Sequence, residues 1–194
     1  GWAYPDDLCE RADALVEAGY EGGVAMGGDL PPRPAGADAP VFVASALRDP
    51  GTSAFPGGKL QRIQIVKAWA DADGTAHQRV FDVAGSAANG ASVDAATCAP
   101  TGPGHDQLCA VWRDPEFEPD RAVVYYARVV ENPSCRWNAW QCLALPEAER
   151  PAACDDPAVP KTIQERAWTS PIWYAPEAAT PQATAAVPTS SVAD

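Results

Sequence analysis

The small supply of large core-forming side chains is the feature that most constrains how this chain can fold. Only 32 of its 194 residues are Leu, Ile, Val or Phe, and the formal net charge is -12. Low hydrophobicity combined with high net charge is typical of disordered chains. Seven Trp, five Tyr and six Cys argue against disorder, because folded cores and disulfide frameworks use these residues. We therefore expect a loop-rich, mainly β domain whose small core is supported by disulfides.

The cysteines define the expected covalent framework. An even number without C-x-x-C pairs favours disulfides over a zinc site and indicates an oxidising compartment, either extracellular or periplasmic. Cys98 and Cys109 are the best predicted pair, because the loop between them is rich in Gly and Pro. Cys154 is predicted to pair with Cys142 or Cys135, and the other connectivities stay open. The predicted disulfide cysteines are Cys9, Cys98, Cys109, Cys135, Cys142 and Cys154.

The charge and the lack of a long apolar run limit the partners of the chain. The 26 acidic residues outnumber the 14 basic ones, which argues against binding to nucleic acid or to an anionic membrane surface. No apolar run approaches the roughly 18 residues that a membrane-spanning helix needs. The chain opens on Gly1 without an initiating Met, so we expect it to be the inner part of a longer protein.

Period-two patterns indicate strands through most of the chain. We predict strands over residues 41–48, 60–70, 77–84, 107–112, 121–131 and 162–174. Residues 71–74 form a predicted turn that joins the second and third strands in a hairpin, and the fifth strand is apolar on both faces, as a central strand should be. Residues 8–19 are the one predicted helix, with a loop as the alternative. The expected fold is mainly β, an antiparallel, immunoglobulin-like β-sandwich with long disulfide-linked loops and at most one short helix.

Composition divides the chain into three parts. Residues 1–40 form an N-terminal segment of loops and one short helix, and residues 41–175 form the predicted sandwich. Residues 176–194 are rich in Ala, Pro, Thr and Ser, so we expect a flexible tail.

Few residues suggest chemistry by themselves. Asp71, Asp73 and Gly74 resemble the start of a calcium loop, but no closing Glu follows, so a hairpin turn is the favoured interpretation. With His77, the two aspartates remain weak metal-site candidates. The chain has no G-x-S-x-G, H-E-x-x-H or phosphate-loop motif, and nothing assembles a nucleophile, a base and an oxyanion donor. We therefore expect no established catalytic residue and no cofactor within this chain.

A group of Arg and Trp residues marks the second half of the sequence. Its members are Arg128, Arg136, Trp137, Trp140, Arg166 and Trp168. An Arg guanidinium can stack on an aromatic ring while it pairs with a carboxylate. One interpretation is a surface that recognises a polar ligand such as a sugar or a sulfate. The favoured interpretation is a buried lattice of ion pairs and stacked rings at a sheet or domain junction.

Several long runs resemble one bacterial family. They are MGGDL (26–30), LQRIQIVKAW (60–69), FDVAG (81–85), VWRDPEFEP (111–119), VYYARVVENPSCRW (124–137) and TIQERAWTSPIWY (162–174). These runs are similar to the C-terminal part of the family catalogued as domain of unknown function 3604. The resemblance implies an exported protein related to metal-dependent hydrolases of the polymerase-and-histidinol-phosphatase type, whose divalent metal and metal ligands lie upstream of Gly1. It also makes Asp29, in the first run, a weak candidate for a catalytic acid near the active centre.

Two functions follow from these expectations. The favoured one is the C-terminal β-sandwich part of the hydrolase-like protein, which packs on the N-terminal catalytic portion and shapes its cleft without being catalytic by itself. The alternative is a secreted module without enzymatic activity that binds a glycan or the cell envelope, or assembles into a homo-oligomer.

Overall fold

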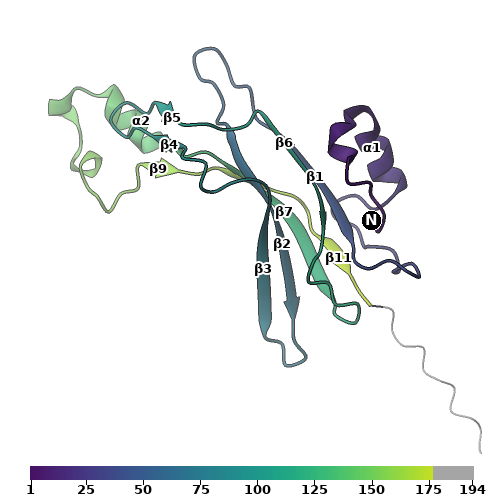
Figure 1. Ribbon diagram of the computed structural model, residues 1–194. Helices are drawn as coiled ribbons and strands as arrows, with labels where there is room; N and C mark the ends of the chain where they lie inside the picture. Colours follow the sequence, from purple (N-terminus) through teal and green to yellow (C-terminus); the bar gives the residue numbers. More distant parts are fainter. Residues whose placement is uncertain (177–194) are drawn as a thin grey trace, which may run out of the picture.

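Two antiparallel sheets form the body of the molecule in the computed structural model, which describes residues 1–176 (Figure 1). The larger sheet has the strand order β10-β7-β2-β3, and β11 also pairs with β7. Its strands are β2 (Leu60–Ala70), β3 (Ala76–Gly85), β7 (Val123–Glu131), β10 (Arg166–Trp168) and β11 (Ile172–Tyr174). The smaller sheet pairs β1 (Val41–Leu47) with β6 (Gln107–Arg113). The strand that is apolar on both faces, β7, lies inside the larger sheet as predicted.

The main hydrophobic core lies between these sheets. Phe42 of β1 and Trp112 of β6 pack against Ile65 of β2 and Tyr125 of β7. The ring centroids of Phe42 and Tyr125 are 4.5 Å apart. Side chains from two facing sheets that meet in this way define a sandwich. The prediction of a mainly β, antiparallel sandwich is therefore confirmed.

The N-terminal segment packs directly on the sandwich. It contains η1 (Leu8–Glu10) and α1 (Ala12–Glu21). Trp2 and Leu30 belong to the main core, and Leu8 is fully buried in a second cluster beside β1. The predicted helix thus begins as a 3-10 turn and runs past Gly19, its expected end.

An arm of short elements extends from the end of β7 (Figure 1). Its elements are β8 (Ser134–Cys135), α2 (Trp137–Ala144), η2 (Glu147–Glu149), η3 (Ala152–Cys154) and β9 (Thr162–Ile163). The antiparallel pair β8–β9 closes the base of the arm, beside a small hairpin of β4 (Ser92–Val93) and β5 (Pro100–Thr101). Helix α2 corrects the expectation of at most one helix. The single strand expected over residues 162–174 is instead divided into β9, β10 and β11.

The β2–β3 hairpin forms where the sequence predicts it. The N–H of Asp71 donates to the Thr75 carbonyl, and the N–H of Gly74 donates to the Asp71 carbonyl, each at 2.9 Å. Gly74 has a φ of +86°, which glycine adopts without steric cost. The prediction of a turn over residues 71–74 is therefore confirmed.

Three disulfides link the described part of the chain. They are Cys9–Cys109, Cys98–Cys135 and Cys142–Cys154. The last of these is one of the two pairs predicted for Cys154, and it closes the arm. The predicted Cys98–Cys109 bond is wrong.

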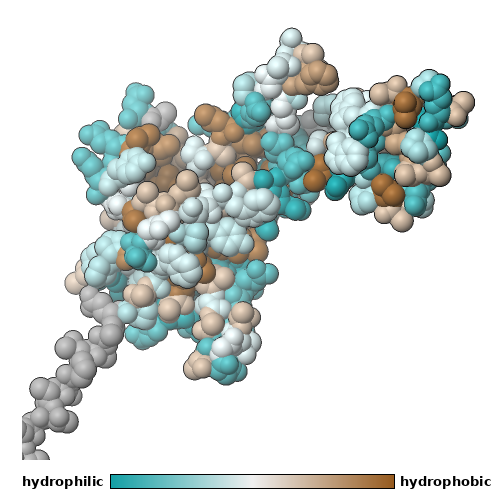
Figure 2. All heavy atoms as spheres, turned by 180° about the vertical axis from the view of Figure 1, so that it is seen from behind, coloured by the Kyte–Doolittle hydropathy of each residue, from teal (hydrophilic) through white to brown (hydrophobic). Residues whose placement is uncertain are grey.

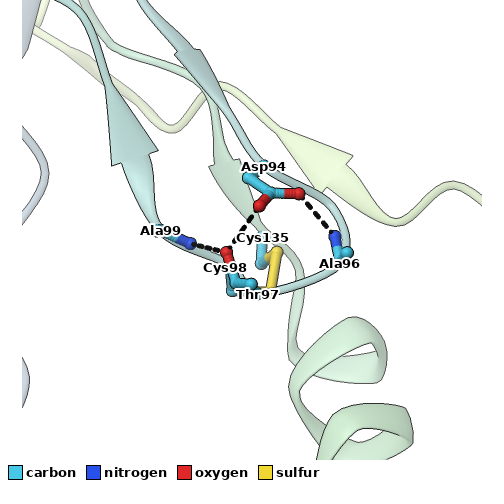
Figure 3. The surroundings of a disulfide bond; sticks show 6 residues. All are labelled: Asp94, Ala96, Thr97, Cys98, Ala99 and Cys135. Carbon is cyan, nitrogen blue, oxygen red and sulfur yellow. Dashed lines mark hydrogen bonds between the residues drawn. A yellow bond between two sulfur atoms is a disulfide. The ribbon is translucent and has the colours of Figure 1, made fainter.

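The geometry of one turn explains why Cys98 does not reach Cys109. Asp94 accepts hydrogen bonds from the Ala96 N–H and the Thr97 hydroxyl, and these bonds shape the turn that carries Cys98 (Figure 3). The turn holds Cys98 against Cys135 of β8, at the base of the arm. Cys109 lies in the middle of β6, which contacts η1. A Gly/Pro-rich loop was thus a poor guide to which cysteines meet.

Candidate functional site

The weak metal-site candidates lie at the β2–β3 hairpin, Asp71 and Asp73 in the turn and His77 at the start of β3. Asp71 Oδ2 lies 2.6 Å from His77 Nε2, and Asp73 accepts a hydrogen bond from the Thr75 N–H at 2.9 Å. Hydrogen bonds from Thr75 lower the pKa of the Asp73 carboxyl. Across residues 1–176, no three His, Cys, Asp or Glu side chains come together as metal ligands. These side chains therefore act in the turn, and the residues present do not fit a metal centre.

Asp29 lies on an exposed segment that runs beside β11. It forms an isolated parallel bridge with Trp173, and the next residue, Leu30, donates its N–H to the Trp173 carbonyl at 2.7 Å. Gly27 donates its N–H to the Pro171 carbonyl at 2.9 Å. The glycine-rich run is thus held in place by backbone hydrogen bonds, and its carboxylate is exposed to solvent.

The Arg and Trp residues of the second half do not form one cluster. Arg128 of β7 donates from Nε to Gln64 Oε1 at 2.8 Å and lies opposite Trp168 in the sheet. Trp168 and Arg166, both on β10, are exposed.

Trp137 and Trp140 lie apart from these residues, on α2 in the arm, and are 67% and 50% exposed. Within residues 1–176, no ion pair joins Arg128, Arg136 or Arg166 to a carboxylate. The favoured interpretation, a buried ion-pair lattice, is therefore wrong.

A mainly apolar groove lies beside β1. We call it the β1 groove. It has a volume of about 340 Å³ and is lined by α1, residues 24–26, β1, β2, β7 and the connection from β10 to β11. Most of its lining is apolar. Apolar residues reach the surface of both the sandwich and the arm (Figure 2).

The rim of the β1 groove exposes large apolar side chains. Val16 and Tyr20 of α1 are 65% and 73% exposed, and Met26 is 62% exposed. A volume of this size falls in the range of ligand pockets, and an exposed apolar rim is typical of a surface that another molecule covers. The lining comes from segments that are far apart in the sequence. Sequence patterns could not have identified the groove, because each segment by itself reads as ordinary core or helix.

A buried polar network joins the two sheets. Lys67 of β2 donates from Nζ to Asp114 Oδ2 at 2.7 Å and to the Glu116 carbonyl at 2.6 Å. The Tyr125 hydroxyl donates to Asp114 Oδ2 at 2.7 Å. Burial, followed by the hydrogen bond to Asp114 and its charge, raises the pKa of Tyr125. The charged groups of Lys67 and Asp114 both have hydrogen-bond partners. The network therefore connects β2, β7 and the end of β6 without leaving a buried charge unpaired.

These features define a class of protein: a disulfide-linked antiparallel β-sandwich of the type that folds outside the cytoplasm, with a large apolar groove. In the described residues, no helix is long and apolar enough to cross a membrane. The model of the family described as "Protein of unknown function (DUF3604)" matches residues 1–176, and the chain belongs to this family. No curated protein and no solved structure matches the chain.

Proposed function

We propose that this chain is the C-terminal β-sandwich part of an exported, metal-dependent hydrolase-like protein. It packs on the N-terminal catalytic portion of the same protein and shapes the substrate cleft without supplying catalytic groups. The observation that carries the proposal is the β1 groove with its exposed apolar rim. Burying one large apolar side chain stabilises an interface by roughly 1.5–3 kcal/mol. Burial of Val16, Tyr20 and Met26 would therefore contribute favourably to the binding of a partner and offset part of the entropy cost of association.

The hydrolytic metal belongs to the other portion in this proposal. The described residues hold no group of three metal-ligating side chains, so no step of hydrolysis is assigned to them. Membership in the DUF3604 family does not define a reaction.

Coexpression of this chain with the catalytic portion as two separate pieces tests the packing. Val16→Asp and Tyr20→Asp should prevent the two pieces from eluting together, because each places a charge in an apolar contact. The free energy of unfolding of the chain itself should change by less than about 0.5 kcal/mol, because both side chains are exposed. Leu47→Asp is the matched control, since Leu47 is 73% exposed but lies outside the groove. Equal elution of all variants with the catalytic portion would contradict the proposal.

Metal analysis of the intact protein tests the reaction class. We expect bound divalent metal, hydrolysis of an ester substrate, and loss of that activity on chelation. An intact protein that is free of metal and indifferent to chelators would refute the hydrolase part of the proposal.

The exposed tryptophans of α2 support a second candidate function, a secreted module for binding or self-assembly. Trp137 and Trp140 are three residues apart and therefore lie on one side of the helix. Exposed Trp pairs suit a sugar ring or a second copy of the chain. Trp137→Ala and Trp140→Ala should then abolish retention on a glycan column or shift the oligomeric state, whereas the control Trp173→Ala should not.

A further inference from the structure

The backbone of β1 presents a free edge to the β1 groove. The Val41 N–H donates to the Gly1 carbonyl at 2.9 Å, and the Gly1 amino group donates to the Val41 carbonyl at 3.0 Å. The opposite edge of β1 is paired with β6. Because peptide groups alternate in direction along a strand, those of Val43 and Ser45 point to the same side as those of Val41. In residues 1–176, no strand pairs with Val43 or Ser45 on that side.

An apolar floor lies next to this free edge. Ile63 of β2 and Ala127 of β7 line the groove, as do Val16 and Tyr20 on the α1 side. The smaller sheet has two strands, β1 and β6, so it leaves part of the larger sheet facing the groove. An unpaired strand edge beside an apolar channel is the geometry in which an extended segment adds to a sheet, with backbone hydrogen bonds on one side and alternate side chains in the channel.

We propose that the β1 groove holds an added β-strand, formed by the segment that directly precedes Gly1 in the longer protein. The inference rests on the proposed function, since it assigns the occupant to the same polypeptide. The two hydrogen bonds exchanged by Gly1 and Val41 are those of an antiparallel pair, so they fix the direction of the added strand.

The Gly1–Val41 pair also fixes the register. Counting back from Gly1, the first residue lies opposite Phe42, the second opposite Val43, the third opposite Ala44 and the fourth opposite Ser45. Phe42 and Ala44 pack in the core between the sheets, and directly opposite residues share a face of the sheet. The first and third residues before Gly1 are therefore apolar, and their side chains cover the floor of the groove. The backbone N–H and C=O groups of the second and fourth residues form hydrogen bonds with those of Val43 and Ser45.

Glycine at the entry of the groove agrees with this path. A Cβ on Gly1 would lie 2.3 Å from the Gly22 carbonyl oxygen and 3.2 Å from the Gly23 Cα. The chain therefore passes between β1 and the segment after α1 only where no side chain projects.

Hydrogen exchange on an extended chain tests the added strand. The full 194-residue chain is extended by six residues before Gly1, with Val at the first, third and fifth positions and Thr at the others. We expect the amide protons of Val43 and Ser45 to exchange at least about 100-fold more slowly than in the unextended chain. The control extension has the same composition with Val and Thr exchanged, and it should give much weaker protection.

Each outcome decides a part of the inference. Exchange of both amides at the rate of the unextended chain would overturn the added strand, and equal protection by both extensions would overturn the register. If the Val43 and Ser45 amides of the unextended chain exchange more slowly as the protein concentration rises, a second copy of the chain is the occupant. That result would overturn the assignment to the same polypeptide. Gly1→Val in the extended chain should remove the protection while circular dichroism shows a folded sandwich. None of these measurements involves a catalytic portion. A negative result here would therefore contradict the added strand alone, whereas negative elution and metal tests would contradict the proposed function.

Discussion

Replacing Lys67 by Met tests how the two sheets are held together. The side chains of Lys67 and Asp114 are 2% and 0% exposed, and their charged atoms are 2.7 Å apart. In the variant the Asp114 carboxylate keeps the Tyr125 hydroxyl and the Glu116 N–H as donors but loses its counterion. An uncompensated buried charge costs about 3–5 kcal/mol, a large share of the about 5–15 kcal/mol that stabilises an average domain. We therefore expect Lys67→Met to lower the free energy of unfolding by about 3–5 kcal/mol.

Urea denaturation followed by Trp fluorescence, without reductant, measures this loss. The double variant Lys67→Met with Asp114→Asn should recover at least about half of it, because the unpaired charge is then absent. The control Arg79→Ala removes the exposed ion pair with Glu116 and should change the free energy of unfolding only slightly, because solvent screens this pair. If Lys67→Met costs no more than the control, or if the double variant is less stable than the single one, the reasoning from buried charge is refuted.

Three further outcomes are expected. In the 194-residue chain that begins at Gly1, burial lowers the pKa of the Gly1 amino group from 8.0 to about 6, so the unfolded chain binds more protons than the folded one between these values. The stability of this chain should therefore rise from pH 6 to pH 8 by at most about 2–3 kcal/mol. Acetylation of the amino group, or an extension before Gly1, should remove this slope in a pH series of melting temperatures. Gly85→Ala should lower the free energy of unfolding by more than about 3 kcal/mol, because the φ of Gly85 is +70° and the new Cβ would lie 2.2 Å from a carbonyl oxygen of β2. Gly74 has a similar φ of +86° but lies in open space, so Gly74→Ala should cost only about 1 kcal/mol in the same urea assay. Replacing Cys142 and Cys154 by Ser should increase proteolysis of the arm in the folded protein but leave hydrogen exchange of the β2 and β7 amides unchanged, because this disulfide stabilises only the arm. Slower cleavage of the arm would contradict this role.

The strands of the sandwich were predictable because their side chains alternate. In β2, buried Ile63 and Ile65 and half-buried Trp69 mark the side chains expected inside, and the turn after it has the residues that a tight hairpin needs. The last strand was predicted as one piece because each part alternates. Pro171, which lacks an N–H, lies between β10 and β11, so the ladder is broken there.

Long-range arrangement could not be predicted in the same way. The partner of Cys98 depends on where a turn places it, and the sequence between cysteines says little about that position. Helix α2 is eight residues long and has no side-chain cap, so it lacked the usual marks of a helix start. Trp137 and Trp140 looked like parts of a core lattice because their residue type is often buried, and only the structure shows them on an exposed helix face.

The order of the disulfides along the chain determines what happens when a protease cuts the backbone once. The Cys9–Cys109 bond spans 100 residues, and the Cys98–Cys135 bond begins inside that span and ends beyond it. One backbone cut at any site between Cys9 and Cys135 therefore leaves two pieces that are still covalently joined. For a protein that works outside the cytoplasm, a nicked molecule would run as a single species under non-reducing conditions and would keep its sandwich assembled.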